Sequence, residues 1–274
     1  MKEGHNGDMH TPLIPEMPKP QYVMSQEGFR LATYTWGDED APVVLAVHGF
    51  ASSAQDNWVN TGWVSRLIDA GFRVLAVDQR GHGRSEKPHD AENYTMPSLV
   101  ADVEAILDVY MVDPVLYLGY SLGARVGWHV AAELSNRVER AVLGGIPDGR
   151  PLGRLDLEQA RAYIADGTAV TDPATQNYVR LAERVAGNDL GALVALAEGM
   201  RFGDENPDMG DAPQQPTLVA AGTDDTIFED AKGLASLLPD GSFIEIPKRH
   251  HFNAPGARQF KDAGIEFLKA ALDA

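Results

Sequence analysis

LYLGYSLG, at residues 116–123, is the stretch that decides how the rest of this chain is interpreted. An apolar run predicts a strand over Val115–Leu118, and a helical pattern predicts a helix over Leu122–Leu134. Between them lies G-x-S-x-G, in which two glycines bracket Ser121. A serine on a strained strand-to-helix turn needs neighbours without a Cβ, because other parts of the chain pass close by. The pattern in this context predicts a nucleophile; the competing interpretation is a glycine-bracketed turn with an incidental serine.

Short apolar runs alternate with helical patterns on both sides of this stretch. Further strands are expected at Val43–Val47, Val74–Val77, Arg140–Ile146, Pro216–Ala221 and Phe243–Ile246. Runs at Tyr22–Ser25 and Phe29–Trp36 flank Glu27-Gly28 and predict a hairpin. Alternating strands and helices imply right-handed crossovers and a mostly parallel sheet, with antiparallel pairing at the edge that carries the hairpin. The expected fold class is α/β, with a mostly parallel central sheet flanked by helices.

The alternation of strands and helices breaks after Ile146 and resumes near Pro216. Helical patterns occur between these points, at Leu157–Ile164 and Tyr178–Val185, without a convincing strand. Because ligands bind at the carboxyl ends of strands in open α/β sheets, we expect this insertion to lie there as a helical lid. The expected organisation is a flexible N-terminal tail, a core in two segments and the lid: 1–20, 21–146 with 216–274, and 147–215.

The composition excludes several classes of function. The chain has 274 residues, of which 23 are basic and 40 acidic, giving a formal net charge of −17. Such a surface repels nucleic acid and anionic lipid, so we expect a small-molecule substrate and neither of these partners. The chain has no cysteine, which excludes disulfides, thiolate nucleophiles and thiolate metal ligands.

The N-terminal sequence carries scattered proline and acidic residues and lacks the apolar segment of a signal peptide. No stretch of the chain reaches the ~20 consecutive apolar residues that a membrane-spanning helix needs. We therefore expect a soluble, cytoplasmic protein. The sequence gives no indication of its oligomeric state.

A second motif follows the first central strand. Val47-His48-Gly49-Phe50 resembles the oxyanion loop of the α/β-hydrolase superfamily. By that resemblance, the backbone N–H groups of Phe50 and Leu122 form the oxyanion hole, in which two donors stabilise charge that develops only in the transition state. His48 is expected to make a hydrogen bond that holds the loop, rather than to act as the base.

The segment DQRGHGRS, at residues 78–85, is similar to the D-x-R-G-H-G-x-S loop of the same family. We expect Asp78, Arg80 and His82 to tie loops together near the nucleophile. The alternative is a metal site that combines His82 with His48 and a carboxylate. The resemblance extends from about Tyr22 to Ala270, apart from the lid, and implies chemistry that needs no metal ion or organic cofactor.

A serine hydroxyl needs an imidazole to take its proton, and that imidazole needs a carboxylate on its other nitrogen. In this fold the chain order is serine, then acid, then histidine. The sequence IPKRHHF at residues 246–252 follows the last expected strand. The spacing usual in the family indicates His251 as the base, with His250 as the alternative.

The acid is expected in the loop after the strand at Pro216–Ala221. The family's G-x-x-D pattern places it at Asp225. Asp224 is the neighbouring candidate and also suits a turn or a helix cap. Asp148 is a third candidate, since some relatives carry the acid after the strand that ends near Ile146.

Together these residues predict a serine hydrolase that forms an acyl-enzyme on Ser121. The default substrate is a small or medium, mostly uncharged carboxylic ester or lactone, because pockets of such folds are mostly apolar. Carbon–carbon bond hydrolases, cofactor-free perhydrolases and hydroxynitrile lyases use a similar triad, so the motifs leave them open. Epoxide hydrolases and haloalkane dehalogenases of the family carry aspartate at the position of the nucleophile, so the serine in this chain argues against both activities. A ligand receptor that retains the triad with little turnover is the alternative from another class.

The sequence does not identify substrate-binding residues. Within the expected lid, Met200, Phe202 and Tyr163 either line an apolar cavity or pack inside the lid itself.

Overall fold

The computed structural model describes residues 15–148, 152–201 and 209–272. Most of the expected N-terminal tail, and Phe202, lie outside these ranges. The strands are β1 Gln21–Met24, β2 Arg30–Trp36, β3 Val43–Val47, β4 Arg73–Val77, β5 Val115–Tyr120, β6 Val138–Gly144, β7 Thr217–Gly222 and β8 Gly241–Ile246. The helices are η1 Gln55–Val59, α1 Trp63–Asp69, η2 Ala91–Asn93, α2 Met96–Tyr110, α3 Leu122–Glu133, α4 Leu157–Asp166, α5 Pro173–Arg184, α6 Leu190–Gly199, α7 Phe228–Ala235 and α8 Arg258–Lys269.

One eight-stranded sheet runs through the core in the order β1-β2-β4-β3-β5-β6-β7-β8. The first two strands form the expected hairpin, and β2 pairs with β4 in antiparallel fashion. All other pairs are parallel. The α/β fold with a mostly parallel sheet is therefore confirmed, and β5, which leads to Ser121, lies near its centre.

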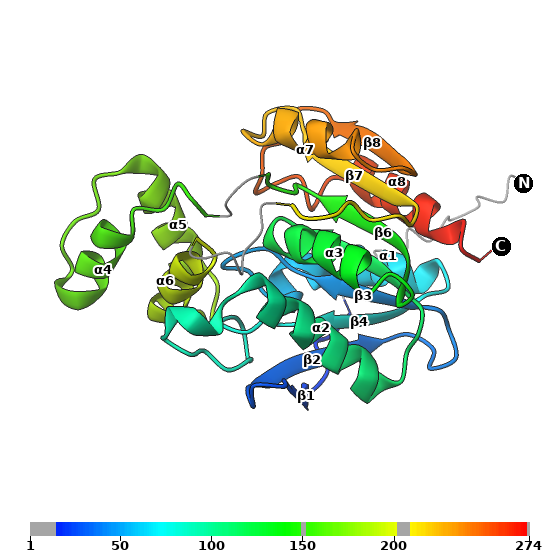
Figure 1. The fold of residues 1–274 in the computed structure, drawn as a ribbon, viewed down its shortest axis with the longest axis horizontal. Coiled ribbons are helices and arrows are strands. Elements are labelled where there is room, and N and C mark those ends of the chain that lie inside the picture. Colours follow the sequence, from blue (N-terminus) through cyan, green and yellow to red (C-terminus); the bar gives the residue numbers. More distant parts are fainter. Residues whose placement is uncertain (1–14, 149–151, 202–208, 273–274) are drawn as a thin grey trace, which may run out of the picture.

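Helices cover both faces of the sheet, with α2 and α3 in front and α1 and α8 behind in Figure 1. On β3, Leu45 and Val47 pack into the apolar layer beneath α2, α3 and α7. The alternate residues, Val44 and Ala46, pack into the layer beneath α1 and α8. A strand with both faces buried must be apolar at every position, which explains the uninterrupted sequence VVLAV.

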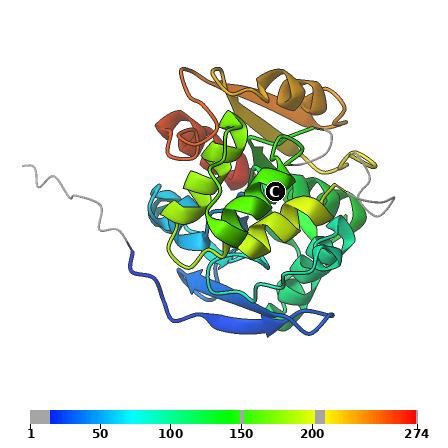
Figure 2. The ribbon, with the colours of Figure 1, turned by 90° about the vertical axis from the view of Figure 1, so that its left-hand side faces the viewer.

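The insertion between β6 and β7 consists of α4, α5 and α6, which lie beyond one end of the strands (Figure 1) and in front of the sheet in Figure 2. Asn188 Nδ2 donates a hydrogen bond of 2.8 Å to the carbonyl of Ala51. Asp189 and His89 form a second link at 3.0 Å. The insertion is therefore hydrogen-bonded to the loops that follow β3 and β4, beside the nucleophile.

Within the described ranges, none of the helices combines the length and apolar character needed to cross a membrane.

Candidate active site

Ser121 occupies a strained turn between β5 and α3. Its φ of 53° and ψ of −115° lie where residues with a side chain are rarely found. The turn is held by its own backbone: Ser121 N–H donates to the Gly144 carbonyl at 2.8 Å, and the Ser121 carbonyl accepts from Arg125 N–H at 2.9 Å. These two bonds fix the backbone on both sides of the serine, so its side chain projects from the carboxyl end of the central strand.

The two glycines of the motif are required by close approach of the backbone. A Cβ on Gly119 would lie 2.5 Å from the carbonyl oxygen of Gly123. A Cβ on Gly123 would lie 2.0 Å from the carbonyl oxygen of Val47, at the end of β3. Both distances are far inside van der Waals contact. The motif therefore reflects the crossing of α3 over the end of β3, and this crossing brings the oxyanion loop to Ser121.

Ser121, His251 and Asp225 lie in a hydrogen-bonded line. His251 Nε2 is 2.8 Å from Ser121 Oγ, and His251 Nδ1 is 2.8 Å from Asp225 Oδ2. The buried carboxylate can only accept, so Nδ1 carries the proton and the Nε2 lone pair accepts from the serine hydroxyl. The Asp225 side chain is 1% exposed, whereas that of His251 is 26% exposed. The arrangement can therefore move a proton from the serine to the imidazole.

The alternative candidates for acid and base are exposed and take no part in this hydrogen-bonded line. Asp224 is exposed and its carboxylate accepts from the neighbouring Thr223 hydroxyl. His250 is exposed, and its Nδ1 accepts from Phe252 N–H at 3.2 Å. Asp148 is also exposed. The structure thus brings together Ser121 and the two residues preferred from the sequence.

The two expected oxyanion donors come from the loop after β3, which carries Phe50, and from the start of α3, at Leu122. Leu122 is the first residue of α3, so its N–H has no acceptor within the helix. In the described part of the chain, Phe50 N–H donates to no protein acceptor. Its neighbours are fixed, because Gly49 N–H donates to Asn57 Oδ1 at 3.1 Å and Ala51 N–H donates to His82 Nε2 at 3.0 Å. Two free donors beside Ser121 match the expected oxyanion hole.

His48 and His82 are fully buried and support this loop through hydrogen bonds to the backbone. His48 Nδ1 donates to the Gly49 carbonyl at 2.7 Å, and its Nε2 accepts from Gln79 N–H at 3.1 Å. His82 Nδ1 donates to the Arg80 carbonyl at 3.0 Å. Burial lowers the pKa of both imidazoles, so both remain neutral. Since all four ring nitrogens are engaged with the backbone, these side chains serve the loop rather than the alternative metal site.

Asp78 and Arg80, the other two residues of the DQRGHGRS segment that were expected to tie loops together, also have structural roles. Asp78 accepts from Ala54 N–H at 2.8 Å and from the Tyr34 hydroxyl at 2.8 Å. Arg80 is 1% exposed and makes two hydrogen bonds of 2.6 Å to Asp102 on α2. The segment ties the oxyanion loop, β2 and α2 together, as expected.

Two aromatic residues, neither of which was predicted to belong to the site, position the loop that carries His251. The Tyr120 hydroxyl donates to the His251 carbonyl at 2.6 Å, and Trp63 Nε1 donates to the Pro255 carbonyl at 2.9 Å. Burial, aided by the negative charge of Asp225, raises the pKa of Tyr120, so the phenol keeps its proton. The available signal was the place of Tyr120 inside the G-x-S-x-G motif, where a buried polar aromatic group needs an acceptor.

Two cavities of unequal size meet at Ser121. The smaller has a volume of about 80 Å³ and the larger about 340 Å³. The walls that they share are formed by Phe50, Ser121, His251 and Phe252. The nucleophile therefore stands between a narrow space and a roomy one.

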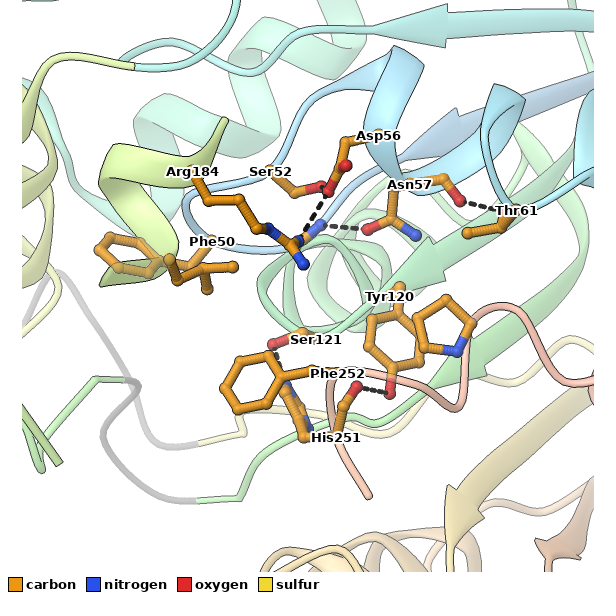
Figure 3. A pocket seen from close by; sticks show the side chains of 13 residues that line it. Phe50, Ser52, Asp56, Asn57, Thr61, Tyr120, Ser121, Arg184, His251 and Phe252 are labelled. Carbon is orange, nitrogen blue, oxygen red and sulfur yellow. Dashed lines mark hydrogen bonds and ion pairs between the residues drawn. The ribbon is translucent and has the colours of Figure 1, made fainter. Parts of the chain in front are cut away.

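The small cavity is polar on the side opposite His251 (Figure 3). Arg184, at the end of α5, pairs with Asp56 of η1 at 3.3 Å. Ser52 donates to the same carboxylate at 3.4 Å, and Asn57 lies beside it in the wall. Neither Arg184 nor Asn57 stood out in the sequence, because both belong to segments without a motif.

The large cavity is lined by both the core and the insertion. Asp225 and Ile227 come from the core, and Leu152 and Tyr178 come from the insertion. Arg154 Nη1 donates to the Thr226 hydroxyl at 3.0 Å and links the two parts. The insertion thus covers the carboxyl ends of the strands, where the sequence predicted a lid.

Met200 and Tyr163, the two described residues among those suggested from the lid sequence, do not line either cavity at Ser121. Met200 is 1% exposed and packs into the core layer. The Tyr163 hydroxyl donates to Glu183, another residue of the insertion. Tyr163 therefore contacts the lid itself, as one alternative predicted, whereas Met200 packs against the core and not inside the lid. Phe202 lies outside the described residues.

Comparison with known proteins gives a family match over the first half of the core. A family model described as the alpha/beta hydrolase fold matches residues 42–172. Epoxide hydrolase A of Mycobacterium tuberculosis is 34% identical over 141 residues, which cover 52% of this chain and 42% of that protein. The bifunctional esterase/perhydrolase DCH of Acinetobacter calcoaceticus is 27% identical over 269 residues, covering 84% of this chain and 92% of that protein.

A solved structure extends the likeness over the whole fold. The enol-lactonase from Burkholderia xenovorans LB400 superposes with a TM-score of 0.74 at 22% identity, covering 91% of this chain and all of the other. Several curated relatives match over less than half of their own length, with 44% and 42% covered in two cases. The sheet order, the strained serine turn and these matches agree, and the chain has the α/β-hydrolase fold.

Proposed function

We propose that this protein is a serine hydrolase that cleaves a small or medium, mostly uncharged carboxylic ester or lactone through an acyl-enzyme. The observation that carries the proposal is the hydrogen-bonded line from Ser121 Oγ through His251 to Asp225, with 2.8 Å at each step. A lone serine hydroxyl is a weak nucleophile, and this line supplies the base and the carboxylate that orients it.

In the acylation step, Ser121 Oγ attacks the substrate carbonyl carbon while His251 Nε2 takes the hydroxyl proton. The carbonyl oxygen becomes an oxyanion, which accepts from the N–H groups of Phe50 and Leu122. When the tetrahedral intermediate collapses, the bond to the leaving oxygen breaks and His251 returns the proton to that oxygen. Asp225 stabilises the imidazolium between these two transfers.

In the deacylation step, water takes the place of Ser121 as the nucleophile, and the same proton transfers follow. His251 removes a proton from the water as its oxygen attacks the acyl carbon. Collapse of the second tetrahedral intermediate breaks the bond to Ser121 Oγ, which regains a proton from His251. The products are a carboxylic acid and an alcohol, or a single hydroxy acid when the substrate is a lactone.

The serine nucleophile favours esters over epoxides, although an epoxide hydrolase is among the relatives. Attack of Ser121 on an epoxide carbon would form an ether, which has no carbonyl for water to attack. An aspartate nucleophile would form an ester that water can cleave. An epoxide would therefore inactivate an enzyme with this serine irreversibly and would not be turned over.

The test is a panel of esters, lactones and thioesters at neutral pH, with Ser121→Ala as the control. We expect Ser121→Ala to fold normally and to lose activity by more than about a thousandfold. Wild-type activity in Ser121→Ala would refute the mechanism. Activity confined to a vinylogous diketone would identify a carbon–carbon bond hydrolase, and folded protein that neither hydrolyses the panel nor reacts with a fluorophosphonate would indicate a receptor.

A second candidate activity is perhydrolysis, which is favoured by the similarity to the bifunctional esterase/perhydrolase of Acinetobacter calcoaceticus. Hydrogen peroxide would replace water in the deacylation step and give a peroxy acid from the same acyl-enzyme. Oxidation of iodide in the presence of ester, peroxide and wild-type protein, and its loss in Ser121→Ala, would establish this activity.

A further inference from the structure

The turn between α5 and α6, formed by residues 185–189, contacts the oxyanion loop from the side of the insertion. Asn188 Nδ2 donates to the Ala51 carbonyl at 2.8 Å and to the Ala182 carbonyl at 3.1 Å. Because both partners are carbonyl oxygens, the end of the amide that faces them is the nitrogen. Asn188 therefore ties the last turn of α5 to the residue that follows Phe50.

Ala51 lies at a point of the loop where the backbone needs support. Its φ of 55° is in the left-handed region, which is unfavourable for a residue with a Cβ. Ala51 is also fully buried. Within the described residues, Asn188 is the donor to its carbonyl, and no other group shares that role. The unfavourable conformation of Ala51 is therefore stabilised by a side chain of the insertion.

The two residues of this part of the loop are each held between His82 and the insertion. The ring of Phe50 lies edge-to-face with that of His82, with centroids 6.0 Å apart, and with that of Tyr178 on α5 at 5.7 Å. Ala51 N–H donates to His82 Nε2 at 3.0 Å, while its carbonyl accepts from Asn188. The insertion thus packs against the residue that carries the oxyanion donor and hydrogen-bonds the residue after it.

Other contacts of the same turn are made to a different loop. A Cβ on Gly187 would lie 3.3 Å from the carbonyl oxygen of Gly83. Asp189 pairs with His89 at 3.0 Å, and these side chains are 39% and 62% exposed. Both contacts dock the turn on the segment that follows β4, whereas the Asn188 side chain reaches the loop that follows β3.

Phe50 N–H lies between two anchored residues. Before it, Gly49 N–H donates to Asn57 Oδ1 at 3.1 Å. After it, Ala51 is fixed by His82 and Asn188. A donor of an oxyanion hole stabilises the transition state only when it is aimed at the place where the negative charge develops. Without Asn188, Ala51 can leave its unfavourable φ, and the Phe50 N–H turns with it.

We propose, on the basis of the proposed function, that Asn188 is a positioning residue for the oxyanion hole. It lines neither cavity at Ser121, so it acts through Ala51 and not through contact with the substrate. The insertion then contributes to stabilisation of the transition state as well as to the wall of the larger cavity.

The test uses Asn188→Leu, which keeps most of the side-chain volume and removes both hydrogen bonds. Wild type and variant are compared by kcat/KM for the best ester of the panel and by the inhibition constants of two compounds, benzyl trifluoromethyl ketone and the alcohol obtained by reducing it. Ser121 Oγ adds to the ketone carbon, its proton passes to His251 Nε2, and the carbonyl oxygen becomes an oxyanion. The alcohol has no carbonyl and cannot form this adduct.

In the wild type we expect the ketone to bind at least about a hundredfold more tightly than the alcohol, because the adduct resembles the tetrahedral intermediate. In Asn188→Leu, kcat/KM should fall about tenfold and the inhibition constant of the ketone should rise about tenfold, while that of the alcohol stays the same. A smaller folded fraction would lower the rate without changing either inhibition constant. A distorted cavity would weaken both compounds alike.

His89→Ala is the matched control, because it removes the ion pair that docks the same turn on the other loop. His89 lines neither cavity at Ser121, and we expect wild-type values for both inhibitors. An unchanged inhibition constant of the ketone in Asn188→Leu overturns the proposal. An equal rise for both compounds does so as well, and so does an equal effect of His89→Ala.

Asn188→Ala, which adds no atoms, replaces the leucine variant if that protein does not fold. If neither variant folds, Asn188 is required for stability and the positioning role is overturned. If the wild type hydrolyses no ester and binds the ketone no better than the alcohol, the proposed function fails. That result is distinct from a working wild type whose inhibition constants are unchanged in the variant.

Discussion

The hydroxyl of Tyr120 donates a hydrogen bond to the backbone carbonyl of His251, with 2.6 Å between the two oxygens. The residue directly before the nucleophile therefore holds the loop that carries the base, and the two aromatic rings lie 5.4 Å apart. Through this bond the end of β5 fixes two members of the triad at once.

Tyr120→Phe removes this hydrogen bond and keeps the packed ring. We expect kcat to fall by about five- to tenfold, because the imidazole spends less time within proton-transfer distance of Ser121. KM and the melting temperature should change little. Tyr110→Phe is the control, since the Tyr110 hydroxyl bonds Thr33 and Gln21, which line neither cavity at Ser121. Equal effects of the two substitutions on ester hydrolysis would contradict the positioning role.

Asp225→Asn should be far more damaging than Asp224→Asn. An amide at position 225 cannot stabilise the imidazolium and favours the wrong tautomer of His251, so we expect kcat to fall by about 10³- to 10⁴-fold. Asp224 is exposed and its carboxylate accepts only from Thr223. Steady-state ester hydrolysis by both variants checks the assignment, and the reverse ranking would move the acid by one residue.

Gly123→Ala should prevent the nucleophile turn from forming. The new Cβ would lie 2.0 Å from the Val47 carbonyl oxygen, a backbone atom that cannot move without breaking β3. We expect a loss of stability of more than about 4 kcal/mol, or insoluble protein. The control is Gly233→Ala on the exposed side of α7, where a Cβ meets nothing within 4 Å. That change should stabilise the protein by about 0.5–1 kcal/mol in urea unfolding, since alanine is the better helix former.

His129 should make the protein less stable in mild acid. Burial, together with the nearby charge of Arg125, lowers its pKa from 6.5 to about 4. The unfolded chain therefore binds a proton at a higher pH than the folded protein does, and stability falls as the pH drops below 6.5. From pH 7.5 to 5.5 the loss from this residue is about 1 kcal/mol.

His129→Leu has no ionisable group at this position and should lose correspondingly less stability over the same range. Urea unfolding at the two pH values, for both proteins, measures the difference. An unchanged pH dependence would mean that the imidazole has the same pKa in the folded and in the unfolded protein, and would contradict the prediction.

Much of the core could be predicted because its signals are local. The apolar sequence of β3 and the hairpin around Gly28 each reflect burial or a turn at that point of the chain. Element boundaries are less local: the apolar pattern after β7 predicts a helix over Ala231–Leu238, whereas α7 spans Phe228–Ala235, three residues earlier at each end. Its last predicted residues, up to Leu238, instead form the turn into β8.

The insertion was harder to predict for two physical reasons. Helix α5 begins at Pro173, earlier than its apolar pattern indicates, because Asp172 caps it and accepts from Thr175 N–H. Helix α6 is buried on nearly every side, so its sequence has no clear polar face. Asp189 caps this helix as well, and the two capping residues were the available signals for both starts.

The candidate site was predictable where a motif fixes the backbone and unpredictable where side chains meet across the fold. Ser121 and the oxyanion loop follow from the close packing of glycines. Arg184 and Asn57 become neighbours of the nucleophile only through the docking of α5 on η1, which no local pattern encodes.

The residues around Ser121 come from two parts of the chain, and this affects how the shape of the larger cavity can change by mutation. The core contributes the serine, its base and its acid, while Leu152 and Tyr178 of the insertion form much of the wall of the larger cavity. Exchanging these two residues can therefore change the shape of the larger cavity without touching the hydrogen-bonded line of Ser121, His251 and Asp225. Part of the selectivity can thus drift or be engineered while the residues of that line stay fixed.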